Sequence, residues 1–199
     1  MNRHVHGTNT PGRGGAGRKS LLCGAFALLC AFLCAGSPAQ TMAFRPSDVK
    51  AVFLLNFVKF VEWPSAVFPD GEAPVIIGVL GDDAFGSVVE KTVAGETVKN
   101  RPVVVKRSRR LADLRQCHVL FISASENLRL PAILASLKGT GILTVGEHAE
   151  FTRLGGIIGL AIHDNKMCFE INAHAAGQES LKISANLLRV ARAVNKQDR

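Results

Sequence analysis

Short apolar runs alternate with amphipathic segments along most of the chain. The runs are apolar on successive residues, which is typical of strands buried on both faces of a sheet. We expect these strands at 74–80, 103–106, 118–122 and 142–145. The segments between them predict helices at 46–61, 82–93, 111–116 and 126–138. Strands that alternate with helices favour a single-domain α/β fold, with a mostly parallel sheet flanked by helices.

The pattern changes near the C-terminus. Two β-rich runs, 157–162 and 166–171, are separated by His163-Asp164-Asn165, which is typical of a hairpin turn. We therefore expect a C-terminal antiparallel hairpin at one edge of the sheet. A last helix is predicted over 180–194, because apolar residues recur there at helical spacing: Ile183, Leu187, Val190 and Val194.

The first predicted helix is apolar around most of its circumference. Pro46 and Asp48 favour a helix start, and Trp63-Pro64 ends the helix because a residue before proline avoids the helical region. A helix of this kind is buried on more than one side. It is either a central core helix or one that also packs against a second subunit or a regulatory partner. The candidate partner-binding residues are Phe53, Phe57, Phe60, Glu62 and Trp63.

The N-terminal segment has the features of a secretory signal peptide over residues 1–39. Its start is basic, an apolar stretch covers 21–35, and Ser37-Pro38-Ala39 offers small residues before a cut. The apolar stretch is short for a membrane-spanning helix, which needs roughly 20 residues, although an uncleaved anchor is the alternative. We expect a flexible stretch at 40–45, an α/β domain at 46–196, and export to the periplasm.

The net charge at first favours a nucleic-acid partner. The 199 residues include 24 Lys+Arg and 16 Asp+Glu, a net charge of +8. Removal of the leader, with four basic residues and no acid, lowers the net charge to +4. The densest basic run, 106–110, has no interleaved aromatic residue on which a base would stack. We expect no nucleic-acid binding and interpret this run as a solvated loop, with an acidic protein or anionic ligand as the second interpretation.

Two cysteines, Cys117 and Cys168, remain after the leader. In an oxidising compartment they form a possible disulfide, but two buried thiols fit the sequence equally well. A metal site is not expected, because the cysteines are isolated and no paired spacing of cysteines or histidines is present.

Polar residues follow several of the predicted strands, where open α/β sheets bind ligands. They are candidates for binding a small polar molecule: Asp82, Asp83, Ser123, Ser125 and Gly146. Helix capping explains the aspartates and Ser125 as well. No nucleophile with a base and no phosphate-binding loop is present, so we expect no catalytic residues, no enzymatic activity and no cofactor.

The segment KAVFLLNFVKFVEWP, residues 50–64, resembles the KAAFLYNFAKFVEWP opening of the YfiR-like family. The resemblance continues in order through 77–86, 117–122, 143–146, 169–172 and 181–188. It implies a periplasmic α/β regulator, commonly a homodimer and not an enzyme. In the family's namesake system, such a protein represses an inner-membrane diguanylate cyclase by binding its periplasmic part, with cyclic-di-GMP and hence biofilm behaviour as the readout, whereas many other members are encoded beside other sensors. An outer-membrane peptidoglycan-associated lipoprotein relieves the repression. A redox control built on two disulfides does not carry over to two cysteines.

These observations lead to one main hypothesis and one alternative. The main hypothesis is a periplasmic negative regulator that represses a membrane diguanylate cyclase, or acts on another sensor, through protein–protein contact. The alternative is a periplasmic solute-binding or sensor protein that holds a polar ligand at the carboxyl ends of the strands.

Overall fold

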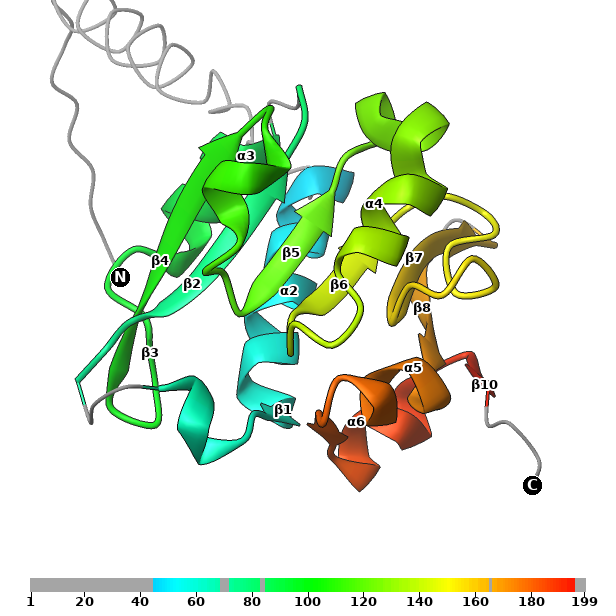
Figure 1. The fold of residues 1–199 in the computed structure, drawn as a ribbon. Coiled ribbons are helices and arrows are strands. Elements are labelled where there is room, and N and C mark those ends of the chain that lie inside the picture. Colours follow the sequence, from blue (N-terminus) through cyan, green and yellow to red (C-terminus); the bar gives the residue numbers. More distant parts are fainter. Residues whose placement is uncertain (1–44, 69–71, 83–84, 165, 196–199) are drawn as a thin grey trace, which may run out of the picture. The chain divides into compact units, whose positions relative to one another are not determined.

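The computed structural model describes residues 45–68, 72–82, 85–164 and 166–195 (Figure 1). The expected signal peptide and the stretch 40–44 lie outside these residues, as does Asp83. Among the described residues, no helix combines the length and the hydrophobicity that a bilayer crossing requires.

An eight-stranded sheet forms the centre of the domain, in the order β10-β8-β7-β6-β5-β2-β4-β3. Five neighbouring strands are parallel to one another: β7 (Ile158–His163), β6 (Leu143–Gly146), β5 (Val119–Ile122), β2 (Val75–Leu80) and β4 (Arg101–Ser108). The short β3 (Thr97–Val98) pairs antiparallel with β4 at one edge. The predicted α/β class with a mostly parallel sheet is therefore confirmed.

Helices cover both faces of this sheet (Figure 1). On one face, α2 (Pro46–Phe60) and α3 (Phe85–Val93) pack with alternate residues of the strands, such as Ile77 and Phe121. On the other face, α4 (Leu130–Ser136) packs against Leu120 and Ile122. Strand residues contribute to two separate apolar clusters because successive side chains of a strand point to opposite faces.

Helix α2 agrees with the prediction. The backbone N–H of Arg45 donates to the Asp48 carboxylate at 3.3 Å, and Pro46 occupies the first turn. The helix ends at Phe60, after which Val61 is extended. Two lysines that interrupt the apolar surface of α2 form salt bridges: Lys50 with Glu147 at 2.8 Å and Lys59 with Glu96 at 3.1 Å.

The expected C-terminal hairpin is present, but it does not form the edge. Strand β8 (Lys166–Asn172) pairs antiparallel with β7 from Ile158 to His163. Strand β10 (Ala193–Asn195) then adds beside β8 in the parallel direction. The edge position was missed because β10 lies within a segment that the apolar spacing assigned to a helix.

The prediction of a single helix over 180–194 is wrong. A short helix, α5 (Ala173–Gln178), precedes this segment, and Ser180 has a left-handed backbone with φ 57°. Strand β9 (Lys182–Ile183) pairs with β1 (Val61–Glu62), α6 covers only Ala185–Val190, and β10 follows. Of the apolar stripe, Leu187 is buried while Val190 is 69% exposed. Pairing of Ile183 with Val61 replaces the helical contacts that the spacing indicated.

The predicted helix over 126–138 is divided. Residues Ala124–Arg129 form a 3-10 helix, and α4 begins at Leu130 with Pro131 in its first turn. Proline is favoured in a first turn because its missing N–H has no partner to lose there. The expected helix over 111–116 is likewise a 3-10 helix, Leu111–Leu114.

Phe151 fills the space beside two glycines. A Cβ atom at Gly146 or at Gly156 would overlap the ring of Phe151, which is 1% exposed. The close approach of this ring therefore requires glycine at both positions.

We predict that Gly146→Ala lowers the free energy of unfolding by about 1–3 kcal/mol, because the added methyl group forces the ring of Phe151 to move. Urea unfolding of the purified protein measures this. The matched control is Gly177→Ala in α5, where an added Cβ meets nothing within 4 Å. This control is expected to raise stability by about 0.4–1 kcal/mol. Equal effects of the two substitutions would contradict the packing argument.

Candidate functional sites at the two ends of the sheet

Polar side chains gather at the carboxyl ends of β2, β4 and β5. The Asp82 backbone N–H donates to Ser125 Oγ at 3.0 Å, and Arg109 binds the Asp82 carboxylate at 2.6 Å. Gly81, with φ 106°, lets the chain turn here, and a Cβ on it would overlap Ser125 Oγ. The structure thus brings Asp82 and Ser125 together as predicted, and adds Arg109.

Two further groups beside these residues are buried. Ser123 is 1% exposed and its Oγ has no hydrogen-bond partner among the described residues. Glu126 is 5% exposed and pairs with Arg129. Sequence reasoning missed the buried carboxylate, because a glutamate in a predicted first turn is ordinarily solvated. Gly146 is explained by Phe151 packing, so a polar ligand at this edge stays a prediction.

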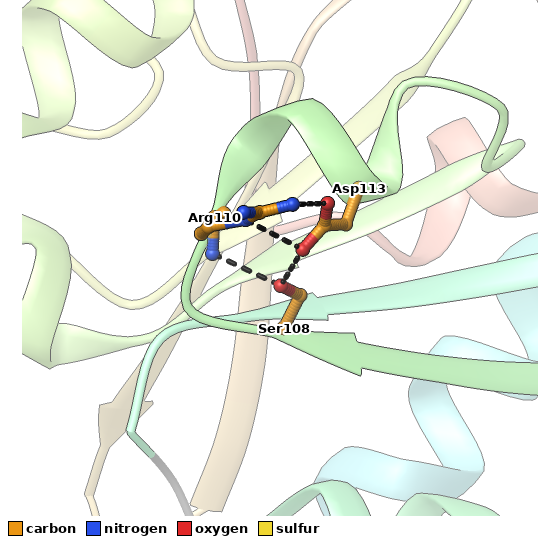
Figure 2. Close-up of polar contacts among 3 residues, drawn as sticks. All are labelled: Ser108, Arg110 and Asp113. Atoms are coloured by element: carbon orange, nitrogen blue, oxygen red, sulfur yellow. Dashed lines mark hydrogen bonds and ion pairs between the residues drawn. The ribbon is translucent and has the colours of Figure 1, made fainter.

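The basic run 106–110 covers the end of β4 and the turn after it, and its three arginines pair with acids of this chain. Arg107 lies 3.9 Å from Glu90, and Arg109 binds Asp82. Figure 2 shows the third pair, in which Arg110 Nε and a terminal nitrogen donate to the two oxygens of Asp113 at 3.0 and 2.5 Å. The interpretation of this run as a solvated loop is therefore wrong, since 106–108 are strand residues and the turn that follows is held by ion pairs.

Ser108 completes this turn. Its hydroxyl donates to Asp113 at 2.7 Å and accepts from the Arg110 backbone N–H at 3.0 Å (Figure 2). Hydrogen bonds from Arg110 and Ser108 lower the pKa of Asp113 from 3.8 to about 2, because they stabilise the charged carboxylate.

The aromatic residues of α2 divide between core and surface. Phe57 is fully buried, with its ring centroid 5.2 Å from that of Phe169 on β8. Phe53 is half-buried and 5.5 Å from the same ring. Phe60 is 40% exposed and Glu62 is exposed. The inclusion of Phe57 as a partner contact is therefore wrong, since its whole side chain lies inside this domain.

A second cluster lies at the opposite, amino ends of the strands. His118, which precedes β5, is 7% exposed and accepts a hydrogen bond on Nδ1 from the Ile76 backbone N–H at 3.0 Å. Its ring stacks on Phe68, with centroids 4.6 Å apart and planes 10° apart. The edge of Trp63 lies against it at 6.2 Å, and the Arg101 guanidinium lies 4.3 Å from the Phe68 ring centroid.

Two cavities flank this aromatic cluster. One has a volume of about 470 Å³ and is lined by residues that include Val67, Cys117, His118 and Gly141. The other has a volume of about 310 Å³ and is lined by residues that include Trp63, Phe68, Lys99 and Arg101. Both cavities lie at the amino ends of the strands, and none of the predicted ligand residues at the carboxyl ends lines them.

Of the two alternatives for the cysteines, the structure has free thiols and not the possible disulfide. Cys117 and Cys168 are both free, and β6 and β7 lie between β5, which follows Cys117, and β8, which carries Cys168. Neighbouring strands are about 4.8 Å apart, so the two residues are too far apart for a disulfide. Burial raises the pKa of Cys117 to about 12, which keeps it a thiol. Within the described ranges, no three His, Cys, Asp or Glu side chains group as metal ligands would.

The chain belongs to the YfiR/HmsC-like family, whose profile matches residues 47–192. This match covers nearly all of the described domain and confirms the resemblance on which the sequence interpretation was built. No curated protein matches the chain.

Two solved structures are similar to this chain at low identity. A conserved domain protein from Vibrio cholerae O1 biovar El Tor strain N16961 is 13% identical, with a TM-score of 0.52. An ABC domain from Streptococcus pneumoniae in complex with L-Trp is 11% identical, with a TM-score of 0.48. Each match covers 75% of this chain and 60% of the other chain, so this chain spans about three fifths of their length. The match to the Vibrio cholerae protein shows a similar α/β fold and nothing more.

We predict that acid destabilises the domain through His118. Burial, and then the charge of Arg101, lower the pKa of His118 below 6.5, so the unfolded chain binds the proton more tightly than the folded one. Neutral His118 contributes fully to the free energy of unfolding above pH 6.5. This contribution is lost as the pH falls from 6.5 towards the lower pKa that His118 has in the folded protein. The free energy of unfolding should fall by at most about 1.4 kcal/mol per pH unit from this group.

Urea unfolding between pH 8 and pH 5 measures this dependence. In His118→Gln, the free energy of unfolding should fall less steeply with pH, because the group that takes up the proton is gone. His163→Gln, which changes an exposed histidine, is the matched control and should behave as the natural protein does. An identical pH dependence in His118→Gln and the natural protein would rule out this role.

A second prediction concerns Asp113. Its carboxyl should titrate near pH 2 by NMR, and in Arg110→Gln its pKa should rise towards 3.8, because the principal hydrogen-bond donor is lost. Arg115→Gln, which removes an arginine that bonds instead to the Ser136 carbonyl, is the control. If Asp113 titrates at the same pH in Arg110→Gln, the pairing in Figure 2 does not control its charge.

Proposed function

We propose that this protein is a periplasmic repressor of an inner-membrane diguanylate cyclase, which it inhibits through protein–protein contact. The observation that carries this proposal is the YfiR/HmsC-like match over residues 47–192. The regulatory theme of that family also supports a role that is not enzymatic. The signal-peptide pattern of residues 1–39 supports export to the periplasm.

The carboxylates at the carboxyl ends of the strands are each paired with an arginine of the same chain. Asp82 pairs with Arg109, Asp113 with Arg110, and Glu126 with Arg129. The proposed function assigns these pairs no catalytic role.

The proposed contact surface is the exposed end of α2 together with β1. Val52 is 44% and Phe60 is 40% exposed, and Glu62 is exposed beside them in sequence. Val52 and Phe60 are eight residues apart, with Asn56 between them, so they follow one side of the helix. Trp63 is half-buried and completes the surface. Exposed aromatic side chains are the usual anchors of protein interfaces.

Repression requires that this surface bind the inactive conformation of the cyclase more tightly than the active one. We propose that an outer-membrane peptidoglycan-associated lipoprotein competes for the protein and so relieves repression. We propose also that the protein works as a homodimer. The expected cellular result of its loss is higher cyclic-di-GMP and more biofilm.

We predict that Phe60→Ala weakens binding to the periplasmic part of the partner cyclase by about tenfold or more, because an interface anchor contributes on the order of 2 kcal/mol. Isothermal titration calorimetry with the purified proteins measures the affinity. Cyclic-di-GMP in a deletion strain complemented with the variant measures repression.

Val104→Ala is the matched control, since Val104 is also 40% exposed but lies on β4. It should bind and repress as the natural protein does. Full affinity in both Phe60→Ala and Glu62→Ala would show that the contact surface lies elsewhere. Unchanged cyclic-di-GMP on deletion of the gene would refute the repressor role itself.

A further inference from the structure

The cavity of about 310 Å³ at the amino ends of β2 and β4 is formed by side chains of three kinds. Four valines make apolar walls, Trp63 and Phe68 add aromatic surfaces, and Lys99 and Arg101 supply positive charge. The valines are Val58, Val61, Val75 and Val98. A volume near 300 Å³ is at the small end of the range for ligand pockets.

Trp63 contributes its indole ring to the wall of this cavity. Its Nε1–H is buried and has no hydrogen-bond partner among the described residues. Because this nitrogen is buried, a molecule in the cavity does not reach it, so the ring and not the donor is available to a ligand.

Arg101 is held in a defined orientation at the same cavity. One terminal nitrogen donates to the Ala73 carbonyl at 2.9 Å, and the guanidinium carbon lies 4.3 Å from the Phe68 ring centroid. A guanidinium carries five N–H donors in a planar fork that matches a carboxylate. Fixing the plane in advance lowers the cost of binding an anion.

Lys99 adds a second positive charge. It is exposed, in the turn between β3 and β4, with a left-handed φ of 51°. None of the described residues that line the cavity is acidic. The positive charge at the cavity is also felt by His118, whose pKa is lowered in part by Arg101. The lining is therefore complementary to a molecule with an apolar body and one negative charge.

We propose that this cavity binds a small carboxylic acid with an apolar body. The carboxylate contacts Arg101 and Lys99, and the apolar body packs among the valines and against the ring of Trp63. This site lies at the opposite end of the strands from the predicted polar-ligand residues Asp82, Ser123 and Ser125. It goes beyond the proposed repressor function and does not depend on it.

Intrinsic fluorescence tests the proposal directly, because Trp63 is the only tryptophan and the chain has no tyrosine. The purified protein is titrated with phenylacetate and with hexanoate, and then with phenylacetamide and with acetate. At least one of the two larger acids should give a saturable fluorescence change. Phenylacetamide, which lacks the charge, and acetate, which lacks the body, should bind about tenfold more weakly or worse.

Variants locate the site. Lys99→Asn, which suits a left-handed backbone, and Arg101→Gln should each weaken binding of the acid by about tenfold. Lys166→Gln, on β8 far along the sheet, should not change it. Circular dichroism confirms that each variant is folded.

Three results would overturn the proposal. The first is no saturable change with either larger acid at 10 mM, a concentration on the order of the weakest affinity that a specific pocket of this kind would show. The second is equal affinity for phenylacetate and phenylacetamide. The third is full affinity in folded Lys99→Asn. If Arg101→Gln fails to fold, the Lys99→Asn result and the ligand comparison still decide.

Discussion

Burial of α2 against the sheet is the interaction on which the rest of the domain depends. Ala51, Leu54, Phe57 and Val58 lie in one apolar cluster with residues of β2, β5, β6, β7 and β8. Burying a side chain of this size contributes about 1.5–3 kcal/mol each, so α2 is a major part of the stability of the domain. Its two lysines pair with Glu147 and Glu96, which lets a nearly all-apolar helix lie here without burying an unpaired charge.

The placement of α2 also fixes elements far away in sequence. Strand β1 begins directly after the helix, and its pairing with β9 joins the C-terminal segment to the N-terminal one. The Ser184 backbone N–H donates to the Phe60 carbonyl at 3.0 Å, at the end of the helix. The aromatic cluster of Trp63, Phe68 and His118 follows from the same placement, since Trp63 comes two residues after Val61. The proposed partner surface and the cavity beside Trp63 are thus both built in part from the end of this helix and the residues that follow it.

The distribution of charge has a different origin. The basic run at the end of β4 is the densest in the sequence, but Glu90, Asp82 and Asp113 pair with its three arginines. Asp82 and Asp113 lie near the run because they follow β2 and β4, and parallel strands have their carboxyl ends on the same side of the sheet. Glu90 lies on α3, which follows β2. The positive charges that line a cavity belong instead to Lys99 and Arg101, at the amino ends of the strands, where the sequence has no run of basic residues.

The sequence by itself predicted six of the eight strands of the central sheet, the first helix and the family. Apolar runs predict buried strands well because a strand covered on both faces has no polar side to confuse with another structure. The same reasoning failed at 180–194. The apolar residues at helical spacing there lie in two short strands, β9 and β10, and in the six-residue helix α6. Ile183 is in a strand because it pairs with Val61, which lies more than a hundred residues earlier in the sequence.

Only the tertiary structure decided which side of α2 is free. A helix that is apolar all round has no polar face to mark the solvent, so Phe57 and Phe60 look alike in the sequence. Packing on β8 buries Phe57 beside Phe169 and leaves Phe60 exposed. The order of the strands likewise separates Cys117 from Cys168, and close packing sets Gly146 against the ring of Phe151. The sequence pattern does not show either feature, because each depends on how segments of the chain pack against one another.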